Sequence, residues 1–236
     1  MYDVTIIGCG VVGALTAREL TRFRLKVCIL EKENDVAMGA SKANSGIVHA
    51  GFDAHPGSLK AKFNVEGNRR MKGVCAALGV KFRANGSLVI AFNDEDRKTV
   101  KELYERGVQN GVPELRILDK TEVHALEPAL SDKVVGALFA PTGGIVCPYG
   151  LTIAAAGNAM DNGAELLTNF EVAHIMKNDS HYTLAAADGR TVESRFVVNS
   201  AGLFSDAVAA MVGDTSFHVH PRSGEYMILD KASAGF

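Results

Sequence analysis

The sequence lacks a strong excess of charge of either sign, a long uninterrupted apolar run and a basic leader. Its 236 residues include 25 lysines and arginines and 27 acidic residues, which gives a formal net charge of −2 and no electrostatic sign of a nucleic-acid partner. The first twenty residues are apolar, but Asp3 and several glycines interrupt them, which argues against a signal peptide and against a membrane span. We therefore expect a globular protein located in the cytoplasm.

The sequence also has few cysteines, and none of them lies in a C-x-x-C pattern. The four are Cys9, Cys28, Cys75 and Cys147. Two of them fall in a predicted glycine-rich turn and a predicted buried strand. We interpret all four as reduced structural thiols, and we expect no metal site.

Glycines are abundant near the start, where residues 4–13 read VTIIGCGVVG. An apolar run with strand character meets Gly8, Gly10 and Gly13 in a G-x-G-x-x-G pattern and continues as a helix-like stretch. The first glycine permits a tight turn, the second lets the backbone approach a pyrophosphate, and the third lets the helix pack on the strand. The helix N-terminus that follows favours a negatively charged group. This pattern predicts a dinucleotide-binding turn.

An acidic residue at the right distance supports this interpretation. A predicted helix over 11–23 is followed by LKVCILEK, an apolar strand that ends in Glu31, eighteen residues after Gly13. A dinucleotide site places an acidic residue about 20 positions on, where it accepts hydrogen bonds from a ribose hydroxyl. An ordinary exposed glutamate is the alternative, but the order strand, turn, helix, strand favours the ribose contact.

The alternation of strand and helix seen at the start of the sequence does not continue in the middle of the chain. The polar stretch 34–51 has neither helical nor strand periodicity, and a loop of this length is usually functional. A helix is predicted over 58–78, and we interpret its basic cluster at 68–72 as a solvent-facing surface in preference to an anion site. Residues 80–92 read VKFRANGSLVIAF, which predicts a hairpin around Asn85-Gly86 and the start of a second structural region.

In the last third of the sequence, an apolar strand that ends in small residues occurs again, as at residues 4–13. A helix is predicted over 148–162, and a hairpin turns at Asp188-Gly189. The following stretch, RFVVNSAGLFSD, has an apolar strand at 196–198 that ends in small residues. Small residues are needed where the backbone comes close to a ligand, so the dinucleotide-binding region is expected to resume here.

These segments, taken in order, resemble the D-amino-acid-oxidase-like superfamily of FAD-dependent oxidoreductases, and most of all its L-2-hydroxyglutarate oxidase and FAD-dependent glycerol-3-phosphate dehydrogenase branch. The resemblance rests on the glycine pattern, Glu31-Lys32, GASKANSGIVHAG, GGIVCPYGLTIA and VVNSAGLFSD. It implies an α/β fold, with a Rossmann-like FAD-binding domain and an interleaved, incomplete antiparallel-sheet substrate domain. The implied division is 1–79 and 146–213 for FAD, and 80–145 and 214–236 for parts of the substrate or cap domain.

The resemblance also implies a set of FAD contacts besides Gly8, Gly10 and Gly13. Those at the adenosine end are Glu31, Lys32 and Val172. Those at the pyrophosphate are Ser41, Lys42, Ala201 and Gly202. Those at the isoalloxazine ring are Asn44, Ser45, Gly46 and His49.

Catalytic residues are less well indicated. His49 is a candidate flavin neighbour that orients the ring or shifts its potential, and the alternative is a loop histidine that satisfies backbone groups. Arg222 is a candidate substrate contact, and nearby His220 is a second candidate for proton abstraction or for binding an acidic substrate. The alternative for His220 is a strand-edge histidine with no catalytic role. The stretch 220–230 resembles a family strand that begins the large substrate sheet. The arginine expected directly before its glycine is replaced by Ser223, which leaves the substrate open.

The implied reaction is hydride transfer to flavin from a small anionic hydroxy compound, such as a 2-hydroxy acid or glycerol 3-phosphate. The electron acceptor, whether quinone, oxygen or a partner protein, stays open, as do peripheral membrane association and the oligomeric state. The alternatives are an amine or amino-acid oxidase, a nicotinamide-dependent dehydrogenase and a non-catalytic dinucleotide-binding fragment. Because members of the family continue beyond the position of Phe236, the resemblance also implies a truncated chain.

Overall fold

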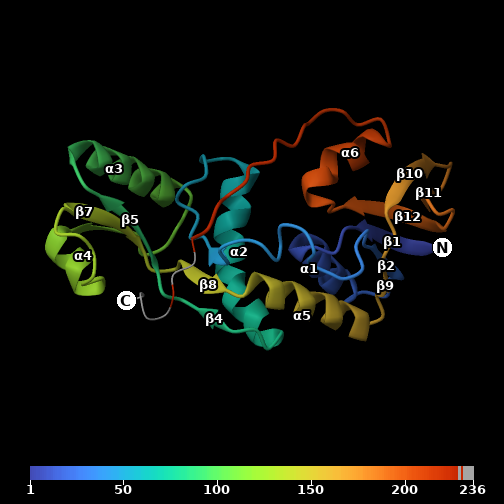
Figure 1. Cartoon of the computed structure of the whole chain (residues 1–236), viewed down its shortest axis with the longest axis horizontal. Helices are drawn as coiled ribbons and strands as arrows, with labels where there is room; N and C mark the ends of the chain where they lie inside the picture. Colours follow the sequence, from blue (N-terminus) through green and yellow to red (C-terminus); the bar gives the residue numbers. More distant parts are fainter. Residues whose placement is uncertain (228–229, 231–236) are drawn as a thin grey trace. The chain divides into compact units, whose positions relative to one another are not determined.

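The computed structural model describes residues 1–227 and Asp230 and divides into two compact units. The first unit comprises Met1–Ser45, Leu78–Val80 and Cys147–Ser223. The second comprises Gly46–Ala77, Lys81–Val146 and the described residues from Gly224 onward. Figure 1 labels the helices and strands of both units and colours them along the sequence.

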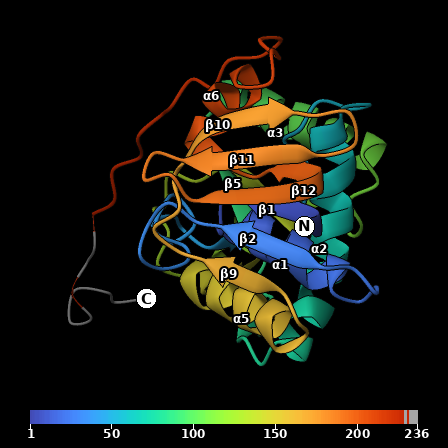
Figure 2. The ribbon, with the colours of Figure 1, turned by 90° about the vertical axis from the view of Figure 1, so that its right-hand side faces the viewer.

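A six-stranded sheet forms the first unit, in the order β10-β11-β12-β1-β2-β9 (Figure 2). Its strands are β1 (Tyr2–Ile7), β2 (Val27–Leu30), β9 (Glu165–Leu167), β10 (Val172–Lys177), β11 (Tyr182–Ala186) and β12 (Thr191–Asn199). Strand β1 is parallel to both of its neighbours, with Ile7 opposite Leu30 of β2 and Asn199 of β12. Strands β10 and β11 add an antiparallel extension. This arrangement confirms the predicted α/β, Rossmann-like fold class.

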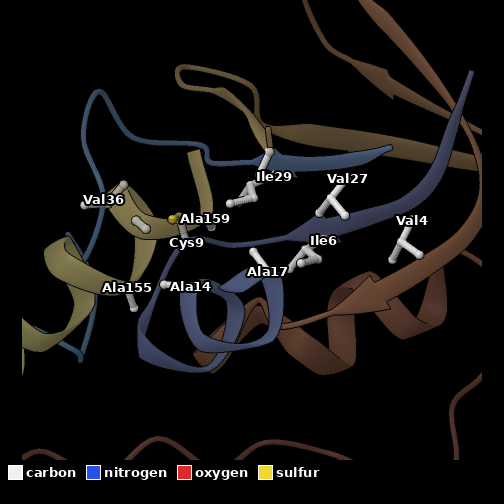
Figure 3. Close-up of a cluster of buried hydrophobic side chains, with 12 residues drawn as sticks. Val4, Ile6, Cys9, Ala14, Ala17, Val27, Ile29, Val36, Ala155 and Ala159 are labelled. Carbon is white, nitrogen blue, oxygen red and sulfur yellow. The ribbon is translucent and has the colours of Figure 1, made fainter. Parts of the chain in front are cut away.

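Two helices cover one face of this sheet, and small residues let them pack closely. They are α1 (Val11–Leu20) and α5 (Pro148–Asp161). The buried alanines Ala14 and Ala17 of α1 and Ala155 and Ala159 of α5 share one cluster with strand residues such as Ile6 (Figure 3). Alternate residues of β1 and β2 point to the opposite face and form a second apolar cluster with β10, β11 and the short helix α6 (Ser205–Ala210). A 3₁₀ turn, Gly202–Phe204, precedes α6.

The second unit contains two small antiparallel sheets and three helices. One sheet has the order β3-β8-β4, and the other has the order β5-β7-β6. The strands are β3 (Ile47–Val48), β4 (Phe82–Arg83), β5 (Ser87–Ala91), β6 (Arg116–Asp119), β7 (Gly136–Ala140) and β8 (Gly144–Val146). The helices are α2 (Leu59–Ala77), α3 (Asp94–Gln109) and α4 (Lys120–Leu126). Asn93 caps α3 by accepting the N–H groups of Glu95 and Asp96, which fixes where that helix begins.

One predicted hairpin is wrong, and the reason is long-range pairing. Strands β4 and β5 flank Asn85-Gly86 as predicted, but they do not pair with each other. Strand β4 pairs with β8, and β5 pairs with β7. Gly86 has a φ of +75° and donates its N–H to the carbonyl oxygen of Gly143. The glycine therefore forms the turn where the chain leaves one small sheet and enters the other. The hairpin predicted at Asp188-Gly189 does form, between β11 and β12.

The compact units differ from the predicted division at residues 46–77 and 214–223. The prediction assigned 46–77 to the FAD-binding domain and 214–223 to the substrate or cap domain, whereas 46–77 group with the second unit and 214–223 with the first. The physical reason for 46–77 is that β3 pairs with β8 and α2 packs beside β4, both within the second unit.

The predicted strand at the end of the chain is not formed in its described part. Residues 220–227 are irregular and largely exposed, and Ile228 and Leu229 lie outside the described residues. A strand requires a partner that takes up its backbone hydrogen bonds, and within the described residues no strand pairs with this segment. Within residues 1–227, no helix combines the length and the apolar character needed to cross a membrane.

Candidate functional site

A cavity of about 330 Å³ opens in the first unit where β1, β2 and β12 end. The carboxyl ends of parallel strands, at the point where the strand order reverses, are the usual ligand site in such sheets. The predicted site residues that line the cavity are Gly8, Gly10, Glu31, Lys32, Ser41, Val172, Ala201 and Gly202. Segments far apart in the sequence are therefore brought together as predicted.

The glycine turn is sterically closed to larger residues. Gly8 has a φ of +95°, and a Cβ atom there would lie 2.6 Å from the carbonyl oxygen of Ser200. A Cβ atom on Gly13 would lie only 2.0 Å from the carbonyl oxygen of Gly8. Helix α1 and the end of β1 can therefore approach each other only because both residues lack side chains.

The start of helix α1 faces the cavity. Gly10 occupies the N-cap position, where it offers no side-chain oxygen, and the first turn contains no acidic residue. The Val11 N–H donates to the Ser41 hydroxyl at 2.9 Å, and a Cβ atom on Gly10 would lie 3.0 Å from that same oxygen. The N–H groups of a first turn have no intrahelical acceptor, so this end of α1 suits a phosphate group.

Glu31 is nearly buried, with 7% of its surface exposed, and lies at the end of β2. Its carboxylate accepts the Cys9 N–H at 2.7 Å and the Glu33 N–H at 3.0 Å. Each oxygen retains a lone pair, so a ribose hydroxyl can still be accepted. Sequence reasoning missed the bond to Cys9, which ties the glycine turn to β2.

Part of the cavity lining is apolar and aromatic, and it includes Phe170, Phe204 and Met211. Lys32 pairs with Glu33 at 2.5 Å, which raises the pKa of Lys32, and its Nζ atom lies 5.0 Å from the centre of the Phe204 ring. Phe204 was not among the predicted contacts, although it lies only two residues beyond Gly202, where the VVNSAG segment ends. Its position after that segment is the signal that could have found it.

The turn after β12 is held in shape by Asn199. The Ala201 N–H donates to Asn199 Oδ1 at 3.2 Å, and Gly202 has a φ of +58°. The Ser200 hydroxyl is buried and has no hydrogen-bond partner among the described residues. A buried polar atom without a partner beside an open cavity fits a site that takes a polar ligand.

Four predicted FAD contacts lie in the first unit but outside the cavity lining. Gly13 is buried within α1, whereas Lys42, Asn44 and Ser45 are exposed. Asn44 donates to the carbonyl oxygens of Ala40 and Ser41, so it braces the loop that carries Ser41.

The remaining predicted residues also lie outside the cavity lining, Gly46 and His49 in the second unit and His220 and Arg222 in the first. The approach of Gly46 and His49 to a flavin stays a prediction. Arg222 is exposed on an irregular segment, and its substrate contact stays a prediction. His220 packs edge-on against His218 at 4.8 Å, and His218 Nδ1 lies 2.6 Å from Asp206, a pair that sequence reasoning missed.

The cysteines differ sharply in exposure. Cys9, Cys28 and Cys75 are buried, whereas Cys147 is exposed at the start of α5. Burial, assisted by the charge of Glu31, raises the pKa of Cys9 to about 12, and burial with the charge of Glu165 does the same for Cys28. Thiolates react with iodoacetamide, so we expect Cys147 to be labelled first at pH 8, with the other three labelled only on unfolding. Peptide mass spectrometry checks the order, and early labelling of Cys9 would contradict it.

The family model described as FAD dependent oxidoreductase matches residues 3–235. The chain belongs to this family. Its members use FAD, and the glycine turn, Glu31 and the cavity of the first unit fit such a cofactor. The sequence is 48% identical over 98% of this chain to a glycerol 3-phosphate dehydrogenase from Caloramator mitchellensis, and 33% identical over 97% to the human mitochondrial L-2-hydroxyglutarate dehydrogenase.

The structural comparison agrees with this membership. A solved structure of L-alpha-glycerophosphate oxidase from Mycoplasma pneumoniae with FAD bound matches with a TM-score of 0.84 and 30% sequence identity. The match covers 89% of this chain and 56% of the oxidase chain. The two relatives named above are covered over 48% and 52% of their own lengths. The chain therefore spans about half the length of the curated relatives it matches.

Proposed function

We propose that the protein is an FAD-dependent oxidoreductase that oxidises a small anionic hydroxy compound, such as glycerol 3-phosphate or a 2-hydroxy acid. The observation that carries this proposal is the 48% identity, across nearly the whole chain, to a protein named glycerol 3-phosphate dehydrogenase. The cavity at the end of the parallel strands supports it, since its lining offers acceptors, helix N–H groups and apolar surface to one dinucleotide.

Each part of the cavity has a proposed role toward FAD. Glu31 accepts a ribose hydroxyl, and Lys32 with Phe204 and the backbone of Val172 borders the adenine. The N–H groups at the start of α1, with Ser41, Ala201 and Gly202, hold the pyrophosphate.

The flavin end of the site involves the loop after Ser41. Asn44, Ser45, Gly46 and His49 approach the isoalloxazine ring, and Lys42 stands beside the pyrophosphate. When bound, FAD supplies an acceptor for a hydride from a carbon that bears a hydroxyl group. His49 orients the ring through a hydrogen bond, and Arg222 neutralises the acidic group of the substrate. A positioned base removes the hydroxyl proton, and His220 is a candidate for it.

The test begins with binding. The purified chain is mixed with FAD and separated from free nucleotide, its visible spectrum is recorded, and the nucleotide released by denaturation is identified. We expect a yellow protein that releases FAD. Preferential retention of NAD would contradict the proposal and favour a nicotinamide-dependent enzyme.

The second step identifies the reaction. Glycerol 3-phosphate, L-2-hydroxyglutarate and glycine are added without oxygen, and bleaching of the flavin band is followed. We expect bleaching by a hydroxy compound and none by glycine. Bleaching by glycine with release of ammonia would favour an amino-acid oxidase. Bound FAD that no substrate bleaches would favour a non-catalytic dinucleotide-binding fragment. The electron acceptor and the cytoplasmic location stay predictions.

A further inference from the structure

The segment after β3 is fastened to the rest of the second unit by side-chain amides. His49 follows directly after Val48, the last residue of β3 to pair with β8. The Nδ2 group of Asn68 donates to the His49 carbonyl oxygen at 3.1 Å and to the Thr142 carbonyl oxygen at 2.8 Å. One amide therefore joins the backbone of His49 to the turn between β7 and β8.

The placement of Asn68 on α2 explains how it reaches these carbonyls. Ala61 and Cys75 are the two buried residues of this helix, and Asn68 stands seven residues from each, on the same face. Its neighbours Arg69 and Arg70 point to solvent and pair with Glu66 at 2.8 Å and 2.5 Å. The prediction of a solvent-facing cluster at 68–72 is right for the two arginines and wrong for Asn68.

A second amide holds the far end of the same segment. Asn110, at the end of α3, donates to the carbonyl oxygens of Gly51 at 3.0 Å and Ala54 at 2.7 Å. Each of the two asparagines therefore donates to two backbone carbonyls. In the segment after β3, Asn68 holds His49, and Asn110 holds Gly51 and Ala54.

We infer that Asn68 is a positioning residue that fixes the backbone of His49 and thereby aims its imidazole. The inference rests on the proposed function insofar as His49 is taken to face the flavin. Loss of the amide leaves the carbonyl oxygens of His49 and Thr142 without their donor. The backbone of His49 then keeps the pairing of Val48 with Gly144 on one side but loses its own bond, so the imidazole that it carries is less restrained.

The first test needs no cofactor. Amide hydrogen exchange is measured by mass spectrometry on the chain and on Asn68→Ala, Asn68→Asp and Asn110→Ala. Both Asn68 variants are expected to speed exchange about tenfold over residues 47–50, which include the paired strand β3, because the bond that holds the end of this strand is lost. Aspartate keeps the size of the side chain but cannot donate. Asn110→Ala is expected to speed exchange at residues 51–54 and to leave residues 47–50 unchanged. Unchanged exchange at 47–50 in a folded Asn68→Asp protein overturns the inference.

The second test uses the FAD-loaded protein and its midpoint potential. We expect His49→Ala and Asn68→Asp to shift the potential in the same direction, and the double variant to shift it no further than His49→Ala alone. Asn110→Ala should leave the potential unchanged. A shift with His49→Ala and none with Asn68→Asp overturns the inference. No shift with His49→Ala overturns the flavin role of His49 in the proposed function, and the exchange result still decides the role of Asn68.

Discussion

Gly13→Ala is expected to weaken FAD binding at least about 100-fold and to lower the free energy of unfolding by more than about 3 kcal/mol. The added methyl carbon would lie 2.0 Å from the Gly8 carbonyl oxygen, which is less than any stable contact between these atoms. Neither partner can yield easily. The Gly8 N–H is bonded to Leu30 at 2.8 Å, and α1 is held on the sheet by its buried alanines.

The loss of binding follows from the same displacement. If α1 moves away from Gly8 by about an ångström, its first N–H groups no longer face the pyrophosphate position, and we expect FAD affinity to fall at least about 100-fold. FAD fluorescence titration and urea unfolding measure the two effects. Wild-type affinity in a Gly13→Ala protein would contradict the assignment of this turn.

The matched control is Gly157→Ala. Gly157 also lies inside a helix, α5, but a Cβ atom there would have no atom within 4 Å. Alanine is the better helix former, so this variant is expected to gain about 0.5–1 kcal/mol and to bind FAD normally. Because the two changes are chemically identical, the difference between them isolates the contact with Gly8.

Glu31→Ala is the second substitution with a large expected effect. It removes the acceptor of the Cys9 and Glu33 N–H groups in a nearly buried position, and one such unsatisfied group costs about 1–3 kcal/mol. The glycine turn loses its link to β2 at the same time. We expect the free energy of unfolding to fall by about 2–3 kcal/mol and FAD affinity to fall about 100-fold, because a charged acceptor for the ribose is also lost.

Glu31→Gln separates the two roles of the carboxylate. Its amide can still accept from one backbone N–H, but its NH₂ group then faces the other donor, so we expect roughly half the loss of stability. Glu33→Gln is the control, since Glu33 is only half-buried, pairs with Lys32 and should change both quantities little. Thermal unfolding with and without FAD measures both effects. If Glu31→Gln and Glu33→Gln behave alike, the ribose role of Glu31 is wrong.

Local patterns in the sequence determined the first unit well. The strand, the three glycines, helix α1 and the strand ending in Glu31 are contiguous, and each follows from sterics or periodicity within a few residues. The VVNSAG segment was placed beside them because an apolar strand that ends in small residues repeats that local signature, and β12 does lie next to β1.

Tertiary structure decided the features that depend on distant partners. The Asn85-Gly86 segment is compatible with a hairpin, but β7 and β8 offered its strands other partners, and residues 46–77 joined the second unit for the same reason. The contacts of Ser41 with α1, of Glu31 with Cys9 and of Asn68 with His49 were likewise invisible in the sequence. A side chain or strand has several acceptable partners by local chemistry, and which one it meets is fixed only when the packed core selects a single arrangement.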